Sequence, residues 1–457
     1  MRRRAAWWAI GLGSLGCLGL LAASVLAPDL LVRFSPVGGL STTFIERLRD
    51  VRALAATLGC LLLLVASWRG GWRGALVALT GLIWVGALVN QLYPNHLIRR
   101  PQALLDAVLG EELLLRDYDP RPHLTVPAHP VTRARYPVIN IHAHFRRWKP
   151  VWTAEQLIGF MDACNIERIV DLDGGLGERF AEEIQSYAAR YPERFIIFAT
   201  FPFSEKMKWG LFPERIAQLA EAKRLGARGI KIWKNLGLRT RDEHKQLVPI
   251  DDPRVDALWA KAGELGLPIL IHVADLPANF DPLDRHNERY EFLKGQMELA
   301  YHGPAAPSPL QLLEQFERVV SRHPDVTFIL AHLGNRSDDL AAAGAMLDCH
   351  PNLYMDVSAR IQELGRQPHT ARAFLIRYQN RLLFGTDGNP ETEDYRTHFR
   401  FFETADEYFD YPFWSLFNYG RWKIYGVDLP DDVLRKLYHD NAARLLGLPL
   451  LAEQEGQ

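Results

Sequence analysis

Eight short apolar runs, separated by longer segments, constrain the fold of this 457-residue chain more than any other feature. Valine, isoleucine, leucine and phenylalanine dominate the runs, as expected for strands buried on both faces. Most of the intervening segments have a helical pattern, and alternation of strand and helix favours a parallel sheet. Eight repeats favour a closed (β/α)8 TIM barrel over an open sheet. The runs lie at residues 137–142, 167–172, 194–200, 227–233, 268–273, 326–332, 352–357 and 381–386.

Histidines and an aspartate stand where four of these runs end. The first run ends with His142 and His144, which alternation places on the same side of a strand. His272, His332 and Asp387 end the fifth, sixth and eighth runs. Because the carboxyl ends of barrel strands meet at the active face, we expect these five side chains to surround one centre. For each motif taken alone, the alternative is coincidence or a structural histidine.

The composition excludes several other classes of protein. The 53 basic and 54 acidic side chains nearly cancel, so nothing indicates a nucleic-acid-binding surface. The four cysteines include no CxxC pair, so they indicate neither a zinc ribbon nor a redox compartment. No glycine-rich phosphate loop follows the first run, which argues against a dinucleotide-binding sheet. The sequence does not set the oligomeric state.

The first hundred residues differ from the rest of the chain. Three apolar runs follow a cluster of arginines at positions 2–4, and each is close to the ~20 residues that cross a bilayer as a helix. We predict a multi-pass membrane anchor of about three transmembrane helices over residues 1–100. A signal peptide for the first run, or buried helices of a soluble domain for all three, are the alternatives. The runs lie at residues 5–31, 53–68 and 74–93.

The arginine cluster also bears on orientation. Positive charges flank the apolar runs on both sides, but the cluster before the first run favours an inside amino terminus. That orientation places the large domain on the extracytoplasmic side of the membrane. Residues 101–136, with several prolines in their second half, are expected to form a linker, and residues 137–450 the barrel.

Five motifs in chain order resemble those of a known superfamily. The sequences VINIHAHF, PILIHVAD, FILAHLGN and LLFGTDGN resemble the strand motifs of the amidohydrolase superfamily, and LYHDNAARLLGL resembles a closing helix. The resemblance is to the amidohydrolase-related branch, which also holds aminocarboxymuconate-semialdehyde decarboxylases and aromatic-acid decarboxylases. It covers residues 137–448 and does not reach the predicted membrane segment.

The resemblance implies one divalent metal ion, most often zinc, held by His142, His144, His272 and Asp387. His332 would lie just beyond the metal as an acid/base or oxyanion group. Three neutral imidazoles and one carboxylate suit zinc, which lowers the pKa of bound water to ~7. Asp387 could then accept the proton of that water and pass it to the leaving group.

Three functions remain open at this point. We expect a metal-dependent hydrolase acting on a small-molecule amide, ester or lactone. A metal-dependent decarboxylase of a small carboxylic acid is the alternative, because the same ligands serve both reactions in the branch. A non-catalytic membrane-anchored binding module is a third, against which the retention of all five site residues counts.

Lys231 and Trp233 in the fourth run are expected to face the barrel interior. Side chains alternate along a strand, and Ile230 and Ile232 would face the outer helices. A buried ammonium group must be neutralised. We predict an ion pair with Asp171 or Asp173 and a single metal. Carboxylation of the lysine, which would make it a ligand of two metals as in some superfamily members, is the alternative.

Two long insertions and one arginine complete the predicted pocket. Residues 276–309 follow the fifth run, and the aromatic-rich residues 389–430 follow the eighth. Segments this long usually form lids or binding surfaces, although a small satellite core of packed aromatics is the simpler interpretation. Arg360, just after the seventh run, could bind a substrate carboxylate or form a surface ion pair.

Overall fold

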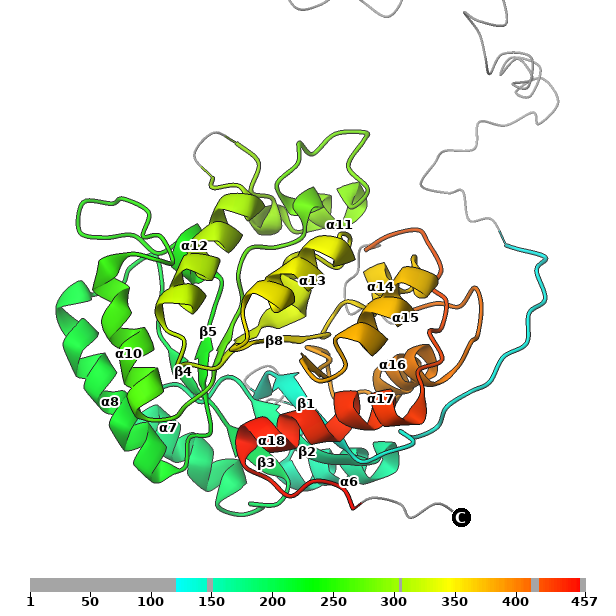
Figure 1. Cartoon of the computed structure of the whole chain (residues 1–457), viewed down its shortest axis with the longest axis horizontal. Coiled ribbons are helices and arrows are strands. Elements are labelled where there is room, and N and C mark those ends of the chain that lie inside the picture. The colour runs from blue at the N-terminus through cyan, green and yellow to red at the C-terminus, as the bar shows by residue number, and fades with distance from the viewer. Residues whose placement is uncertain (1–120, 146–150, 304–305, 412–418, 453–457) are drawn as a thin grey trace, which may run out of the picture. The chain divides into compact units, whose positions relative to one another are not determined.

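The computed structural model describes residues 121–145, 151–303, 306–411 and 419–452 (Figure 1). The three apolar runs of the first hundred residues lie outside the described residues, so the membrane anchor stays a prediction. Within the described part of the chain, no helix combines the length and apolar character needed to cross a bilayer.

All neighbouring strands are parallel, as the alternation of strand and helix predicts. The strands pair in chain order, β1 with β2 and β2 with β3, and then from β4 through to β9. The strands are β1 (Val138–Ala143), β2 (Ile166–Asp171), β3 (Phe195–Ile197), β4 (Ala199–Phe201), β5 (Ile230–Ile232), β6 (Ile269–Ile271), β7 (Phe328–Leu330), β8 (Leu353–Asp356) and β9 (Leu382–Leu383).

The third predicted strand is divided at Phe198 into β3 and β4. The Phe198 amide donates to Asp171 O at 2.9 Å, whereas the next amide, that of Ala199, donates to Gly229 O at 2.9 Å. The strand therefore changes its partner from β2 to β5 at this residue. A Cβ at position 229 would lie 2.3 Å from the Phe198 ring, so the glycine makes room for the phenylalanine.

Hydrogen bonds between the first and last strands close the ring. The Ile141 amide donates to the carbonyl of Phe384, the residue after β9, at 3.0 Å, and the Asp387 amide donates to His142 O at 3.0 Å. Counting the divided strand as one, the ring has the eight strands that the sequence predicts. The pairing of β1 with β2 is irregular between Asn140 and Ala143, next to the histidine pair.

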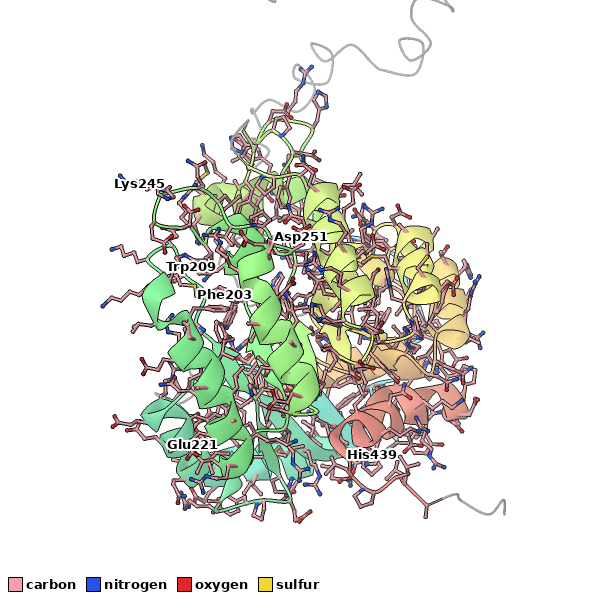
Figure 2. The ribbon with its side chains drawn as sticks, turned by 60° about the vertical axis from the view of Figure 1, so that its left-hand side comes forward. Phe203, Trp209, Glu221, Lys245, Asp251 and His439 are labelled. Atoms are coloured by element: carbon pink, nitrogen blue, oxygen red, sulfur yellow. The ribbon has the colours of Figure 1, made fainter. Side chains whose placement is uncertain are left out.

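The apolar residues form an inner and an outer layer. The inner layer fills the barrel with side chains such as Ile139, Val170 and Phe198, and Leu446 of the last helix closes one end of it. The outer layer lies between the strands and the surrounding helices. Phe203 and Trp209, labelled in Figure 2, belong to this outer layer, while Glu221 of α8 is exposed.

Two of the described helices begin at a capping box. Thr153 and Gln156 form the capping box that opens α6, and Ser308 and Gln311 form the one that opens α12. The helices are α6 (Ala154–Cys164), α7 (Glu178–Glu183), α8 (Phe212–Leu225), α9 (Asn235–Leu238), α10 (Asp256–Glu264), α11 (Tyr290–Gly295), α12 (Pro309–Arg322), α13 (Leu340–Cys349), α14 (Ile361–Leu364), α15 (Pro368–Arg377), α16 (Thr392–Glu403), α17 (Asp431–Arg435) and α18 (Asn441–Leu446).

Part of the segment expected to be a linker lies against the barrel. The His129 amide donates to Asp406 Oδ2 at 2.7 Å, and His129 Nδ1 lies 2.6 Å from Asp406 Oδ1. Arg400 Nε also donates to this carboxylate, at 2.6 Å. The barrel unit therefore begins earlier than residue 137, while the division proposed for residues 1–120 stays a prediction.

The two insertions share a small satellite core, as the simpler interpretation predicts for some of their aromatic residues, whereas Phe399, Phe401, Phe402 and Phe409 belong to the outer layer of the main core. Leu276, Phe292 and Leu293 of the first insertion pack with Tyr419 of the second. Trp422 packs against this cluster from the side. Whether the insertions also act as a lid stays a prediction.

Candidate active site

Backbone strain gathers where the strands end. Ala274, His332, Ala359 and Asp387 follow β6, β7, β8 and β9, and their φ angles are 59°, 59°, 51° and 52°. Non-glycine residues adopt this left-handed region at a cost of roughly 1–3 kcal/mol each. Such residues persist where the surrounding structure holds them and are common at active sites. The strained positions therefore mark one end of the barrel.

Four imidazoles meet at this end. The ring centroids of His142 and His144 are 5.3 Å apart, and those of His142 and His332 are 4.7 Å apart. His272 lies on the other side of His332, with ring centroids 4.5 Å apart. The sequence prediction that these histidines surround one centre is therefore in keeping with the structure.

Each of three rings has its Nδ1 atom engaged. His142 Nδ1 lies 2.9 Å from Asp356 Oδ2, and His144 Nδ1 lies 3.1 Å from Asp173 Oδ1. His332 Nδ1 lies 2.9 Å from the carbonyl oxygen of Ser358. Carbonyl and carboxylate oxygens accept hydrogen bonds, so Nδ1 carries the proton and Nε2 keeps its lone pair in a neutral ring. Each of the three rings thus has an Nε2 lone pair, and that of His142 faces Lys231 Nζ at 3.3 Å.

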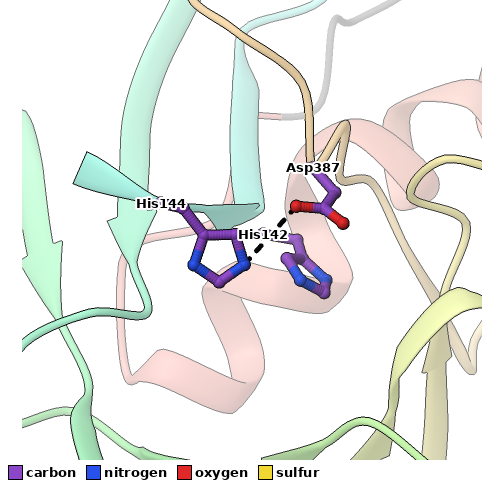
Figure 3. A group of neighbouring side chains, drawn as sticks. All are labelled: His142, His144 and Asp387. Atoms are coloured by element: carbon purple, nitrogen blue, oxygen red, sulfur yellow. Dashed lines mark ion pairs between the residues drawn. The ribbon is translucent and has the colours of Figure 1, made fainter. Parts of the chain in front are cut away.

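Asp387 lies among these Nε2 atoms (Figure 3). Its Oδ1 is 3.4 Å from His144 Nε2, and its Oδ2 is 3.8 Å from His332 Nε2. Ligand atoms of His142, His144 and Asp387 lie within 4.8 Å of one another. The side chain of Asp387 is 18% exposed, whereas that of His144 is 2% exposed. The carboxylate is therefore the part of this group that a substrate or water can reach.

Burial keeps the imidazoles of His142, His272 and His332 neutral. It holds the pKa of His142 well below the usual value, and the Lys231 charge lowers that pKa further. Burial also lowers the pKa of His272 to about 4, against an opposing contribution from Asp275. The pKa of His332 is held well below the usual value by burial, then by the neighbouring His272 and Arg360. Neutral imidazole is the form that binds metals.

His272 is near the centre but does not belong to the close ligand group. Its Nε2 lies 3.3 Å from Asp275 Oδ1, and Asp275 in turn forms an ion pair with Lys234 at 2.5 Å. Although Asp275 lies this close, the buried Nε2 atom of His272 has no hydrogen-bond partner among the described residues. Three of the four expected ligands, His142, His144 and Asp387, lie in one close group. The role of His272 as the fourth ligand stays a prediction.

Lys231 and Trp233 face the barrel interior, as predicted. Lys231 is fully buried, and its Nζ lies 3.3 Å from His142 Nε2 and 5.2 Å from the centroid of the Trp233 ring. The Trp233 ring stacks on His144 with centroids 4.6 Å apart. Both residues therefore contact the predicted ligands. The predicted ion pair of Lys231 with Asp171 or Asp173 stays a prediction.

The sequence reasoning missed a buried network that supports the histidines. Asp356 Oδ1 accepts hydrogen bonds from the backbone amides of His332 at 2.9 Å and of Ser358 at 3.1 Å. The Ser358 hydroxyl lies 3.0 Å from His142 Nδ1. A second possible ligand group, His142, His332 and Asp356, is occupied by these hydrogen bonds. The position of Asp356 at the end of a strand was the signal that could have identified it.

The donor set fits a divalent metal. Nε2 lone pairs and a carboxylate suit zinc and similar ions. Hydrogen bonds from the opposite ring nitrogen to acids or carbonyls orient metal-bound histidines in many proteins, and His142 and His144 have such partners. His142, His144 and Asp387 would hold the ion.

A family model described as Amidohydrolase matches residues 139–448, more than half of the chain. The chain belongs to the amidohydrolase family. Members of this family are metal-dependent enzymes, among them hydrolases and decarboxylases. The fold, the histidines at the strand ends and the family therefore agree. No curated protein matches the chain.

Several solved structures resemble the barrel over 68% of the chain. A 2,6-dihydroxybenzoate decarboxylase from Rhizobium is 17% identical, and the match covers 99% of its chain with a TM-score of 0.45. A dihydroxybenzoic acid decarboxylase from Polaromonas with bound manganese is 15% identical, with 97% of its chain covered and a TM-score of 0.44. A probable 2-pyrone-4,6-dicarboxylic acid hydrolase from Acinetobacter baumannii is 13% identical, with 100% covered and a TM-score of 0.40.

Proposed function

We propose that the chain is a metal-dependent hydrolase that cleaves an amide, ester or lactone of a small molecule. The observation that carries the proposal is the position of Asp387, whose two oxygens face Nε2 of His144 and Nε2 of His332. One carboxylate thus contacts both a proposed ligand and a histidine that supplies acid–base chemistry. A divalent ion, zinc by the donor set, would polarise the substrate carbonyl and lower the pKa of water.

The protein residues divide the proton transfers between them. Asp387, the exposed member of the group, accepts the proton of the attacking water. His332 directs its Nδ1 proton at the Ser358 carbonyl, so its Nε2 carries no proton. This Nε2 can take the water proton from Asp387 and return it to the leaving group. A neutral His332 has no donor at Nε2, which favours its acid/base role over an oxyanion role. Trp233 holds the His144 ring in place.

Decarboxylation of a small carboxylic acid is the competing reaction, because it would use the same residues. Oxygen-18 water separates the two. Hydrolysis places the label in the product acid, whereas decarboxylation releases CO2 and replaces the carboxylate with a proton.

Metal removal tests the proposal. The full chain, dialysed against a chelator, should lose activity toward a panel of lactones, amides and esters, because water without the ion returns to a pKa near 15.7. One equivalent of zinc or manganese should restore the activity, and mass spectrometry should find the label in the product. Full activity without metal would contradict the metal-dependent mechanism. Unlabelled product formed with CO2 would contradict hydrolysis.

A further inference from the structure

Arg360 is a buried arginine beside the candidate active site. The residue lies shortly after the end of β8 and is 6% exposed. The preceding Ser358 and Ala359 connect it to the site, because the Ser358 carbonyl accepts the hydrogen bond of His332 Nδ1. Arg360 is also close enough to His332 to contribute, after burial and His272, to the lowered pKa of that ring.

The contacts of Arg360 leave part of its guanidinium without a protein partner. Nη2 donates to Asn335 Oδ1 and Nη1 donates to the Ala359 carbonyl. Nε is buried and has no hydrogen-bond partner. A guanidinium has five N–H donors, and the one on Nε has no partner among the described residues. Among the described residues, no carboxylate forms an ion pair with Arg360.

Two other cations, the buried Arg289 and the partly buried Lys234, show what compensation looks like in this protein. Arg289 Nη2 lies 2.6 Å from Glu363 Oε1, and Lys234 Nζ lies 2.5 Å from Asp275 Oδ2. Arg360 lacks such a partner, although an isolated buried charge is costly. An anion from outside the protein chain that pairs with Arg360 would offset this free-energy cost.

We propose that Arg360 binds a carboxylate of the substrate and thereby sets the substrate class: an amide, ester or lactone that also carries a carboxylate. The reaction named here rests on the proposed function, whereas the binding of a carboxylate by Arg360 does not. The planar edge formed by Nε and an adjacent Nη matches a carboxylate, which accepts two parallel hydrogen bonds. Asn335, whose amide nitrogen donates to Val273 O at 2.9 Å, fixes the orientation of the guanidinium.

Calorimetric titration of the metal-loaded full chain tests the proposal, with acetate and benzoate as probes and acetamide and benzamide as uncharged partners. Each acid should bind about 10–100-fold more tightly than its amide, as expected for hydrogen bonds to a charged group. Arg360→Gln should lose most of this preference while metal content stays unchanged. Arg377→Gln, at an exposed ion pair with Asp348, is the matched control and should keep the preference.

The remaining outcomes contradict the proposal. No measurable binding of either acid, equal binding of acid and amide, tighter binding of inorganic phosphate, or an undiminished preference in Arg360→Gln would each do so. The last result would assign carboxylate binding to the metal. Failure of the wild-type chain to take up a metal ion would instead count against the proposed function.

Thermal unfolding separates a binding role from a structural one. If Arg360 is kept for a ligand, Arg360→Met removes an uncompensated buried charge and should leave the melting temperature unchanged or raise it. This variant should also lose the preference for acids over amides. A melting temperature lowered by more than about 4 °C would show that the hydrogen bonds of Arg360 serve the fold instead.

Discussion

Replacing His142 with alanine should reduce the metal content from about one equivalent per chain to below about one tenth, and activity should fall at least about 1,000-fold. His142 offers Nε2 to the centre because Asp356 holds its Nδ1. Loss of this ligand removes a member of the close group formed with His144 and Asp387. Without the ion, water loses the large decrease in pKa on which the reaction depends. Elemental analysis and an activity assay on the full chain measure both effects.

The barrel should remain folded in this variant. His142 is 1% exposed, and its loss leaves Asp356 without one partner, at a cost of about 1–3 kcal/mol. Circular dichroism should therefore show native secondary structure with a lowered melting temperature. The matched control is His244→Ala, at an exposed histidine, which should keep its metal and activity. Normal metal content in His142→Ala would show that the ligands are assigned wrongly.

Asp387→Asn should lower kcat by about 10²–10⁴-fold even at saturating metal concentration, because an amide cannot accept the proton of the attacking water. The substitution preserves the size of the side chain. The remaining ligands should keep the ion bound at high metal concentration, so the loss should be in kcat. Steady-state kinetics across a zinc titration measure the effect.

Asp410→Asn is the control for this substitution, because Asp410 is 85% exposed and pairs only with Lys423 in the described part of the chain. It should leave kcat unchanged. If Asp387→Asn kept wild-type kcat once zinc was saturating, Asp387 would be a ligand alone, and another group would have to serve as the base.

Strand positions were predictable from the sequence because each strand is a compact apolar run. The eight predicted runs all contain strands of the structure, and the side-chain alternation correctly placed Lys231 inside the barrel. The division of the third strand at Phe198 was not predictable, because it depends on the shape of a phenylalanine against Gly229 on another strand. Such packing between distant segments leaves no periodic signal.

The candidate site shows the same contrast. The histidines and Asp387 could be predicted because chemistry and position coincide at the strand ends. Asp356 and Asp275 were missed as partners because their roles depend on which ring nitrogen they contact. For Arg360 the sequence left two interpretations open, and only its burial without a carboxylate partner excludes a surface ion pair.

The central claim is that His142, His144 and Asp387 hold one divalent metal ion. Anomalous X-ray scattering from crystals of the zinc-loaded protein, recorded on both sides of the zinc absorption edge, tests it most directly. We expect one peak within about 2.3 Å of His142 Nε2, His144 Nε2 and an Asp387 oxygen. No peak at these atoms would contradict the claim. Two peaks bridged by a carboxylated Lys231 would contradict the single metal.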